Sequence, residues 1–265
     1  MKRDDPGFPA TLAIERAALF VSLDGAILPV ADKVHEVKAS AVCRIVLGRT
    51  RDHLRGRFAV LSHRTIASID AVLGGVIGCV SGANGAQRRT PLGHMRFAPE
   101  RPRLADAAAV LNALARARHG LVVEDRGSSV SIDYRDAADA EAAVLEAVDR
   151  LAGATGLIRW RGNLAIELRA PPPDKGSALG RFMYEVPFSG AVPVFLGSHP
   201  ADETAFVEAS RRGGVGILVG AARATRATRR LDSHVAALSW IMRSLDRGFF
   251  DFRETRGGPS LAFDP

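Results

Sequence analysis

The first hundred residues alternate between short apolar runs and longer segments with helical spacing. The runs 17–23, 57–62 and 76–80 are short and rich in apolar residues, which is typical of strands buried on both faces. Helical spacing is found in 34–47 and in 65–73. Strands that alternate with helices predict a parallel α/β sheet of the Rossmann type.

The periodicity changes after residue 100. Leu164, Ile166 and Leu168 alternate with Ala or charged neighbours, a period of two that predicts a half-buried strand. Helix-like segments precede this strand, and three consecutive prolines at 171–173 follow it as a natural boundary. Residues 101–172 are therefore predicted to form a small α+β unit of helices and antiparallel strands.

The strand–helix alternation then resumes. We expect strands at 192–197 and 215–219 with a helix at 202–212 between them, and an amphipathic helix at 234–245. The remaining residues contain Gly-Gly-Pro and dispersed aromatics, which favours a loosely ordered end. The predicted organisation is a core of 1–100 and 173–247, an inserted cap of 101–172 and a tail of 248–265.

The composition is typical of a globular protein and bears on the kind of partner that it binds. The 265 residues are 47% hydrophobic and 25% charged, which excludes wholesale disorder. The formal charge is +7, and because only four of the 36 basic residues are Lys, 32 are Arg. The arginines are scattered, and the densest group, RATRATRR at 223–230, has no aromatics for base stacking. We therefore do not expect a nucleic-acid partner.

Neither a membrane nor an oxidising compartment is indicated. No apolar stretch approaches the roughly 18 residues that a spanning helix needs. The N-terminal residues lack the shape of a signal peptide, and Cys43 and Cys79 can form neither a disulfide framework nor a CxxC zinc motif. We expect a cytoplasmic protein with buried, inert cysteines.

Polar side chains follow several of the predicted strands. In an open parallel sheet, ligands bind outside the carboxyl ends of the strands. Ser22 and Asp24 follow the first strand, Ser62 follows the second, and Ser198 follows the strand at 192–197. With Lys175 just after the cap, these residues are typical of a phosphate site.

Six motifs along residues 14 to 245 resemble the trehalose-6-phosphate phosphatase family of the haloacid-dehalogenase-like (HAD) superfamily. In chain order, these motifs are LFVSLDGAILPV, AVLSHRTIASID, SGANGAQRR, VEDRGSSVSIDYR, LAIELRAPPPDKG and VFLGSHPADETAF. The resemblance implies a HAD-like Rossmann-type core with an inserted cap, hydrolysis of a sugar phosphate through an aspartyl-phosphate, and magnesium as cofactor.

The resemblance assigns roles, and this chain departs from several of them. Ser22 stands at the position of the nucleophilic Asp, whereas Asp24 keeps that of the general acid/base. Ser62, Arg64 and Lys175 match the phosphate-holding positions. These matches imply that the phosphate subsite is more complete than the catalytic machinery.

The metal site is the most degenerate part. Asp24 is retained, but Ser198 and His199 replace the two adjacent aspartates that position magnesium in the family. Asp202 and Glu203 remain nearby, and Asp202 is a possible metal ligand. Magnesium prefers oxygen ligands such as carboxylates. We therefore expect magnesium binding to be weak or absent.

The predicted cap retains residues that recognise glucose hydroxyls in the family. They are Glu124, Ser129, Glu167 and Arg169. The same polar residues could instead hold the strands together, and the sequence does not separate the two roles. Trp160 and Trp240 are expected to be packing residues.

Three hypotheses follow. The first is an inactive or impaired family member that still binds trehalose 6-phosphate or a related sugar phosphate. The second is an active, magnesium-dependent phosphatase with atypical residues, in which Ser22 would need an adjacent base such as His199. The third is a regulatory or interaction protein of trehalose metabolism, for which no sequence feature identifies a protein partner.

Overall fold

A computed structural model describes residues 9–30, 38–97, 102–127 and 129–257 and divides into two compact units. The core unit is Met1–Ala98 with Pro173–Pro265, and the cap unit is Pro99–Pro172. The chain thus leaves the core unit once and returns to it, as it does around an inserted domain.

The core unit is built on a nine-stranded sheet with the order β15-β13-β12-β11-β2-β3-β4-β5-β6. Its central strands, from β13 to β4, are parallel, and β15, β5 and β6 add antiparallel edges. In chain order the strands are β2 (Ala17–Ser22), β3 (Phe58–Leu61), β4 (Cys79–Gly82), β5 (Gln87–Arg89), β6 (Met95–Phe97), β11 (Val192–Gly197), β12 (Val215–Val219), β13 (Arg229–Leu231) and β15 (Arg256–Gly257).

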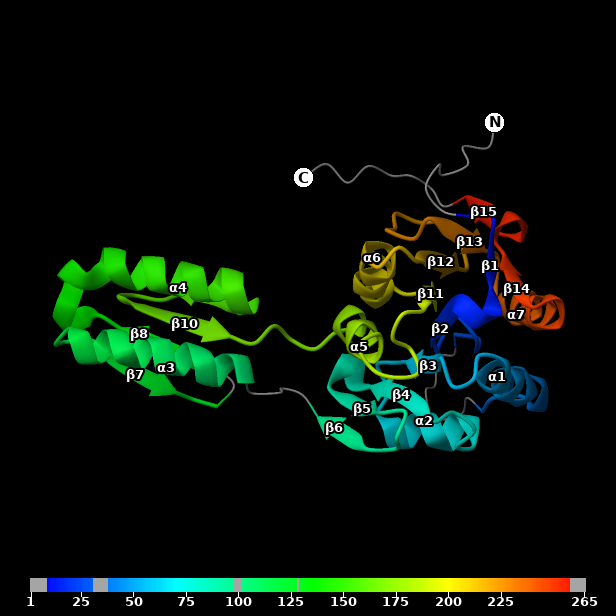
Figure 1. Cartoon of the computed structure of the whole chain (residues 1–265), viewed down its shortest axis with the longest axis horizontal. Coiled ribbons are helices and arrows are strands. Elements are labelled where there is room, and N and C mark those ends of the chain that lie inside the picture. The colour runs from blue at the N-terminus through cyan, green and yellow to red at the C-terminus, as the bar shows by residue number, and fades with distance from the viewer. Residues whose placement is uncertain (1–8, 31–37, 98–101, 128, 258–265) are drawn as a thin grey trace. The chain divides into compact units, whose positions relative to one another are not determined.

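Helices cover both faces of this sheet (Figure 1). They are α1 (Ala41–His53), α2 (Ile66–Leu73), α5 (Lys175–Phe182), α6 (Glu203–Arg211) and α7 (His234–Arg247). Every residue of β2 is buried: Leu19 and Val21 pack in the cluster that contains residues of α1, α2 and α7, and Phe20 packs in the cluster that contains residues of α5 and α6. A strand buried on both faces explains the continuous apolar run from which it was predicted.

The cap unit is a four-stranded antiparallel sheet with two helices on one face. The order is β7-β8-β10-β9. Its elements are α3 (Pro102–Ala117), β7 (Val122–Asp125), β8 (Ser129–Asp133), α4 (Glu141–Thr155), β9 (Ile158–Arg161) and β10 (Ala165–Arg169). Val130, Ile132, Ile166 and Leu168 are buried with apolar residues of α3 and α4, which leaves the other face of the sheet to the alternate residues.

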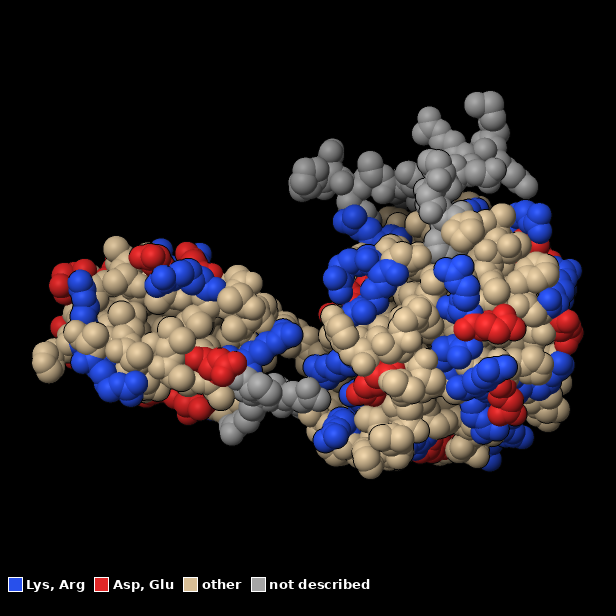
Figure 2. Space-filling model, in the orientation of Figure 1, with Lys and Arg blue, Asp and Glu red and all other residues tan. Residues whose placement is uncertain are grey.

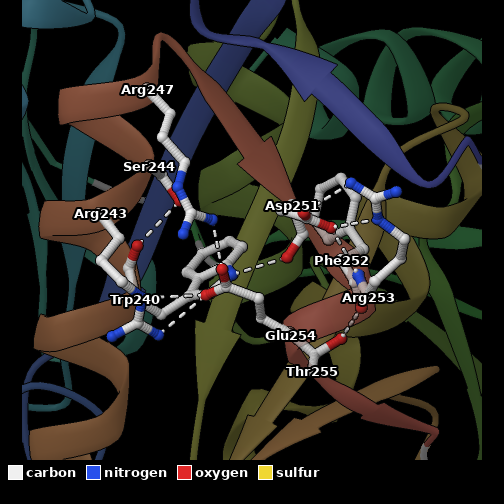
Figure 3. Close-up of polar contacts among 9 residues, drawn as sticks. All are labelled: Trp240, Arg243, Ser244, Arg247, Asp251, Phe252, Arg253, Glu254 and Thr255. Carbon is white, nitrogen blue, oxygen red and sulfur yellow. Dashed lines mark hydrogen bonds and ion pairs between the residues drawn. The ribbon is translucent and has the colours of Figure 1, made fainter.

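The segment after α7 corrects one expectation. Residues 248–257 are not a loose tail: β14 (Phe249–Asp251) pairs with β1 (Thr11–Ala13), and β15 extends the main sheet. Trp240 explains this order, because its ring stacks on Phe250 at 5.1 Å. Its indole N–H also donates to the Asp251 carbonyl at 2.9 Å (Figure 3). Phe250 and Phe252 of this segment are thus core residues. Residues 258–265 lie outside the described part.

The arginine surplus is spread over the surface. Acidic side chains are interspersed among the more numerous basic ones on the face drawn in Figure 2. Exposed pairs such as Arg51–Asp52 and Arg150–Glu146 are typical of this mixture. Among the described residues, no helix is both long and apolar enough to cross a membrane.

Candidate functional site

The neighbouring parallel strands β11, β2 and β3 bring the predicted site residues to one edge of the core sheet. Ser22 ends β2, Ser62 follows β3, and Ser198 follows β11. The turn after β2 needs Gly25, which has a φ of +80° and on which a Cβ would lie 2.4 Å from Ser198 Oγ. This close approach fixes the turn that carries Asp24 against the end of β11.

Lys175 lies buried between Ser22 and Asp202. It is the first residue of α5, which Asp174 caps by accepting from Ser177 N at 2.6 Å. The Lys175 ammonium donates to Ser22 Oγ at 3.0 Å and to Asp202 Oδ1 at 2.5 Å. Lys175 and Asp202 are 3% and 0% exposed, so the pair is shielded from water.

The second oxygen of Asp202 organises the loop after β11. Asp202 Oδ2 accepts from the backbone N–H groups of Ser198 and His199 at 2.8 and 2.9 Å. The Ser198 hydroxyl donates in turn to the carbonyl oxygen of Asp24 at 2.9 Å. His199 Nδ1 accepts from Ala201 N at 3.1 Å, so this ring caps the short helix η4 (Pro200–Asp202).

Asp24 is held by Arg64. The guanidinium of Arg64 donates through Nη2 to Asp24 Oδ1 at 2.6 Å and through Nε to Asp24 Oδ2 at 2.9 Å, a bidentate pair. The Arg64 side chain is only 4% exposed, and that of Asp24 is 20% exposed. Arg64 N also donates to Ser62 Oγ at 3.1 Å. The exposed ring of His63 lies 3.8 Å from Asp24 Oδ2, at the rim.

The loop between β4 and β5 packs against the residues on either side of the site. Ala83 and Asn84 have positive φ, and a Cβ on Gly85, whose φ is +101°, would lie 2.5 Å from the Asp174 carbonyl oxygen. Asn84 N donates to the Ser62 carbonyl at 3.0 Å. The loop is therefore packed between the end of β3 and the start of α5.

In the cap unit, the predicted sugar-binding residues lie on the sheet face that the helices leave open. The strand register places Glu124, Ser131, Glu167 and Trp160 in one row across the four strands. Arg169 donates to Glu167 at 2.6 Å. This hydrogen bond holds the pKa of the Glu167 carboxyl below its usual range, and a hydrogen bond with Ser129 adds a smaller effect in the same direction.

Comparisons with known proteins agree with this architecture. The sequence profile of the trehalose-phosphatases matches residues 20–234, most of the chain. The chain belongs to the trehalose-phosphatase family.

Two relatives and one solved structure illustrate the similarity. The chain is 29% identical to a trehalose-6-phosphate phosphatase of Escherichia coli over 70% of each protein. It is 34% identical to a trehalose-phosphate phosphatase of Mycolicibacterium paratuberculosis. That match covers 89% of this chain and 64% of the relative. A trehalose-6-phosphate phosphatase structure from Aspergillus fumigatus superposes with a TM-score of 0.56 at 17% identity and covers 88% of this chain and 93% of its own. The fold is the HAD-like phosphatase fold with a cap.

The residues of this trehalose-phosphatase family member do not fit a magnesium ion. In the described residues, no group of three or more His, Cys, Asp or Glu side chains could hold a metal. Each carboxylate of the site faces a cation, Asp24 through Arg64 and Asp202 through Lys175. The Asp24 carbonyl accepts a hydrogen bond from Ser198, which leaves a poor set of oxygen ligands for a hard cation.

Among the residues that the structure describes, no base forms a hydrogen bond with the Ser22 hydroxyl. The Ser22 hydroxyl accepts from an ammonium group, and His199, the residue that could have served as its base, uses Nδ1 on the backbone of its own turn. The cysteines are equally unsuited to nucleophilic attack, because burial raises the pKa of Cys43 and Cys79 to about 11.

The structure also identifies residues that sequence reasoning missed or misjudged. Trp240 is buried, as expected, but the expectation that Trp160 packs in a core is wrong: it is 59% exposed on the open face of the cap. The alternation of side chains in β9 could have predicted this exposure. Arg159 and Arg161 pair with Asp149 and Glu141 of α4, so Trp160 between them lies on the opposite face. Ser131 and Asp133 also line the open face.

Proposed function

We propose that this member of the trehalose-phosphatase family binds trehalose 6-phosphate, or a closely related sugar phosphate, without hydrolysing it. One observation carries the proposal. Both carboxylates left at the strand ends, Asp24 and Asp202, form ion pairs with Arg64 and Lys175, and the nucleophile position is a serine that accepts a hydrogen bond from Lys175.

The magnitudes argue against hydrolysis by this set of residues. Phosphate-monoester hydrolysis needs an acceleration of up to ~10²¹-fold. A well-placed hydrogen-bond donor contributes about 3–4 kcal/mol, or roughly two to three powers of ten. Lys175, Arg64 and Ser62 offer donors of this kind, but no carboxylate stands at the nucleophile position and the donor set does not suit a metal ion.

The same residues support binding of an anion. Lys175 and Arg64 place two buried cations beside Ser22 and Ser62, at the edge of the sheet where parallel α/β folds bind ligands. A phosphate oxygen can share the Lys175 ammonium with Ser22 and Asp202, because an ammonium has three N–H groups. Binding of this kind requires no metal.

Calorimetry in the presence of a chelator tests the proposal. Wild-type protein should bind trehalose 6-phosphate in EDTA and release no phosphate when Mg²⁺ is added. The double variant Lys175→Met/Asp202→Asn, which removes both charges of the buried pair, should lose this binding and remain folded. Magnesium-dependent phosphate release by the wild type would establish the rival hypothesis of an active enzyme, and no binding at millimolar ligand would reject the proposed function.

Restoring the missing carboxylates provides an independent readout. The triple variant Ser22→Asp/Ser198→Asp/His199→Asp should gain a Mg²⁺-dependent rise in melting temperature, whereas the wild type should show none. Ser22→Asp alone should gain neither this shift nor phosphatase activity, because it adds one negative charge beside the neutral Lys175–Asp202 pair and leaves the metal positions unfilled. A Mg²⁺-dependent rise in the melting temperature of the wild type would show that its residues do bind the metal.

A further inference from the structure

The open face of the cap sheet contains a hollow of about 210 Å³. Its lining includes three small residues, Ser131, Gly162 and Ala165, which lie on adjacent strands or at the turn between β9 and β10. Larger side chains, among them Trp160 and Val122, also line it. Small residues beside large ones leave a depression in a sheet face that is otherwise covered by side chains.

Trp160 is held at this hollow by the strand that carries it. Arg159 and Arg161, its two neighbours, form ion pairs with α4 at 2.5 and 2.6 Å, so β9 is anchored with the indole on the opposite face. The Arg169 guanidinium carbon lies 5.0 Å from the centroid of the Trp160 ring. Gly162, which follows β9 directly and also lines the hollow, has no side chain to cover the ring.

The charges around the hollow balance. Glu124 pairs with Arg126 at 2.6 Å, and Asp133 pairs with Arg135 at 2.5 Å. Glu167 pairs with Arg169 at 2.6 Å, so three carboxylates face three guanidinium groups. The hollow therefore offers many hydrogen-bond donors and acceptors without a net charge, which suits a neutral ligand rich in hydroxyl groups better than an anion.

An exposed indole beside paired polar groups favours a ligand with one apolar and several polar surfaces. A sugar ring presents its C–H groups to one side and its hydroxyls around the edge, and Trp packs well against such an apolar side while its neighbours bind the polar edge. None of the six motifs that carry the family resemblance includes Trp160.

The family resemblance already implies that Glu124 and Glu167 contact a sugar. Resting on the proposed function, we propose that Trp160 adds an aromatic platform to this face of the cap, and that the platform lets the face bind a neutral sugar ring without help from a phosphate group. Trp160 would then determine which ring the cap accepts.

The two tryptophans make the test direct. Trp160 is exposed and Trp240 is fully buried, so only Trp160 should report on a ligand at the hollow. Trehalose, which has no phosphate, is titrated into the full chain in EDTA, with emission and calorimetric heat recorded together and glycerol at equal molarity as the solute control. A saturable emission change with trehalose and none with glycerol is expected.

Three variants locate the site. Trp160→Ala should weaken trehalose binding by at least about tenfold, as truncation of a Trp anchor commonly does. Trp160→Phe, which keeps an aromatic ring, should bind within about threefold of the wild type by calorimetry. Ile158→Ala is the matched control, because Ile158 is exposed on the same face of β9 but does not line the hollow, and it should bind as the wild type does.

The outcomes separate this inference from the proposed function. If trehalose fails to bind while trehalose 6-phosphate binds, the platform is rejected and the phosphate site stands. If trehalose binds and the Trp160→Ala variant binds it equally well, the platform is also rejected. If trehalose binds through Trp160 and the Lys175→Met/Asp202→Asn variant binds trehalose normally, the platform is supported whether or not the phosphate site is occupied.

Discussion

The core site and the open face of the cap use charged residues in opposite ways. In the core, Lys175 and Asp202 are buried together and Arg64 is buried against Asp24. In the cap, pairs such as Glu124–Arg126 are more than half exposed and surround a hollow. The core charges satisfy one another inside the protein, whereas the cap charges remain in contact with solvent.

This contrast explains how a site can lose carboxylates without losing its structure. The resemblance implies three further carboxylates, at Ser22, Ser198 and His199, and restoring them would change the formal charge of the chain from +7 to +4. Without them, two carboxylates face two cations and the core site is neutral. A cluster with five carboxylates would need a bound cation to offset its repulsion. The substitutions and the misfit to magnesium are therefore two aspects of one change.

The largest predicted effect separates the two kinds of ion pair. Lys175→Met leaves the fully buried Asp202 without its cation, and breaking a buried pair in this way costs about 3–5 kcal/mol. Arg126→Met breaks an exposed pair and should change the free energy of unfolding by less than about 1 kcal/mol. Urea denaturation of both variants measures the difference.

The double variant Lys175→Met/Asp202→Asn controls for the lost Lys side chain. It removes both charges and keeps an oxygen for the backbone N–H groups of Ser198 and His199, so most of the lost stability should return. Equal destabilisation by Lys175→Met and Arg126→Met would show that the buried pair is not what distinguishes the core site.

Sequence patterns predicted the core better than the cap face, for physical reasons. The runs at 17–23 and 192–197 correspond to β2 and β11, because a strand buried on both faces must be apolar throughout. The run at 76–80 was placed a few residues early, since β4 spans Cys79–Gly82 and includes a Ser and a Gly. The tail was misjudged because its order depends on Trp240, a contact with a residue on another element.

The site was predicted as a set of positions but not as a set of pairs. Strand ends brought Ser22, Ser62 and Ser198 together as expected. The bidentate pair of Arg64 with Asp24 depends on side-chain geometry between residues 40 positions apart, which no local pattern encodes. The position of Trp160 was misjudged because tryptophan side chains are commonly buried, whereas the alternation of side chains in β9 places this one on the exposed face of the sheet.

Two glycines test whether the core site is closed and the cap hollow open. Gly25→Ala places a Cβ 2.4 Å from Ser198 Oγ at a φ of +80° and should cost about 1–3 kcal/mol of unfolding free energy. Gly162→Ala meets only the Ala165 carbonyl oxygen at 3.4 Å without a left-handed φ, and should change stability by less than about 0.5 kcal/mol. Thermal unfolding measures both, and trehalose titration should show weaker binding for Gly162→Ala because its methyl group occupies the hollow. A large destabilisation by Gly162→Ala would mean that the hollow is packed rather than open.

The smallest predicted effect concerns the pH dependence of the cap. Because the Arg169 and Ser129 hydrogen bonds lower the pKa of Glu167, folding favours its carboxylate form. The resulting stabilisation is present above the ordinary Glu pKa of about 4.3 and is lost as the pH falls through the lower folded value. Glu167→Gln should therefore reduce stability at pH 7 by less than about 1 kcal/mol, since Arg169 is about half exposed. This loss of stability should shrink as the pH falls below about 4.

Arg169→Gln should reproduce this pH-dependent deficit, and the double variant should add little to either single change, because both remove the same pair. Urea denaturation at pH 7 and pH 3 measures these differences, and a Glu167→Gln deficit that stays constant between the two would show that the lost contact is not one made by the ionised carboxylate.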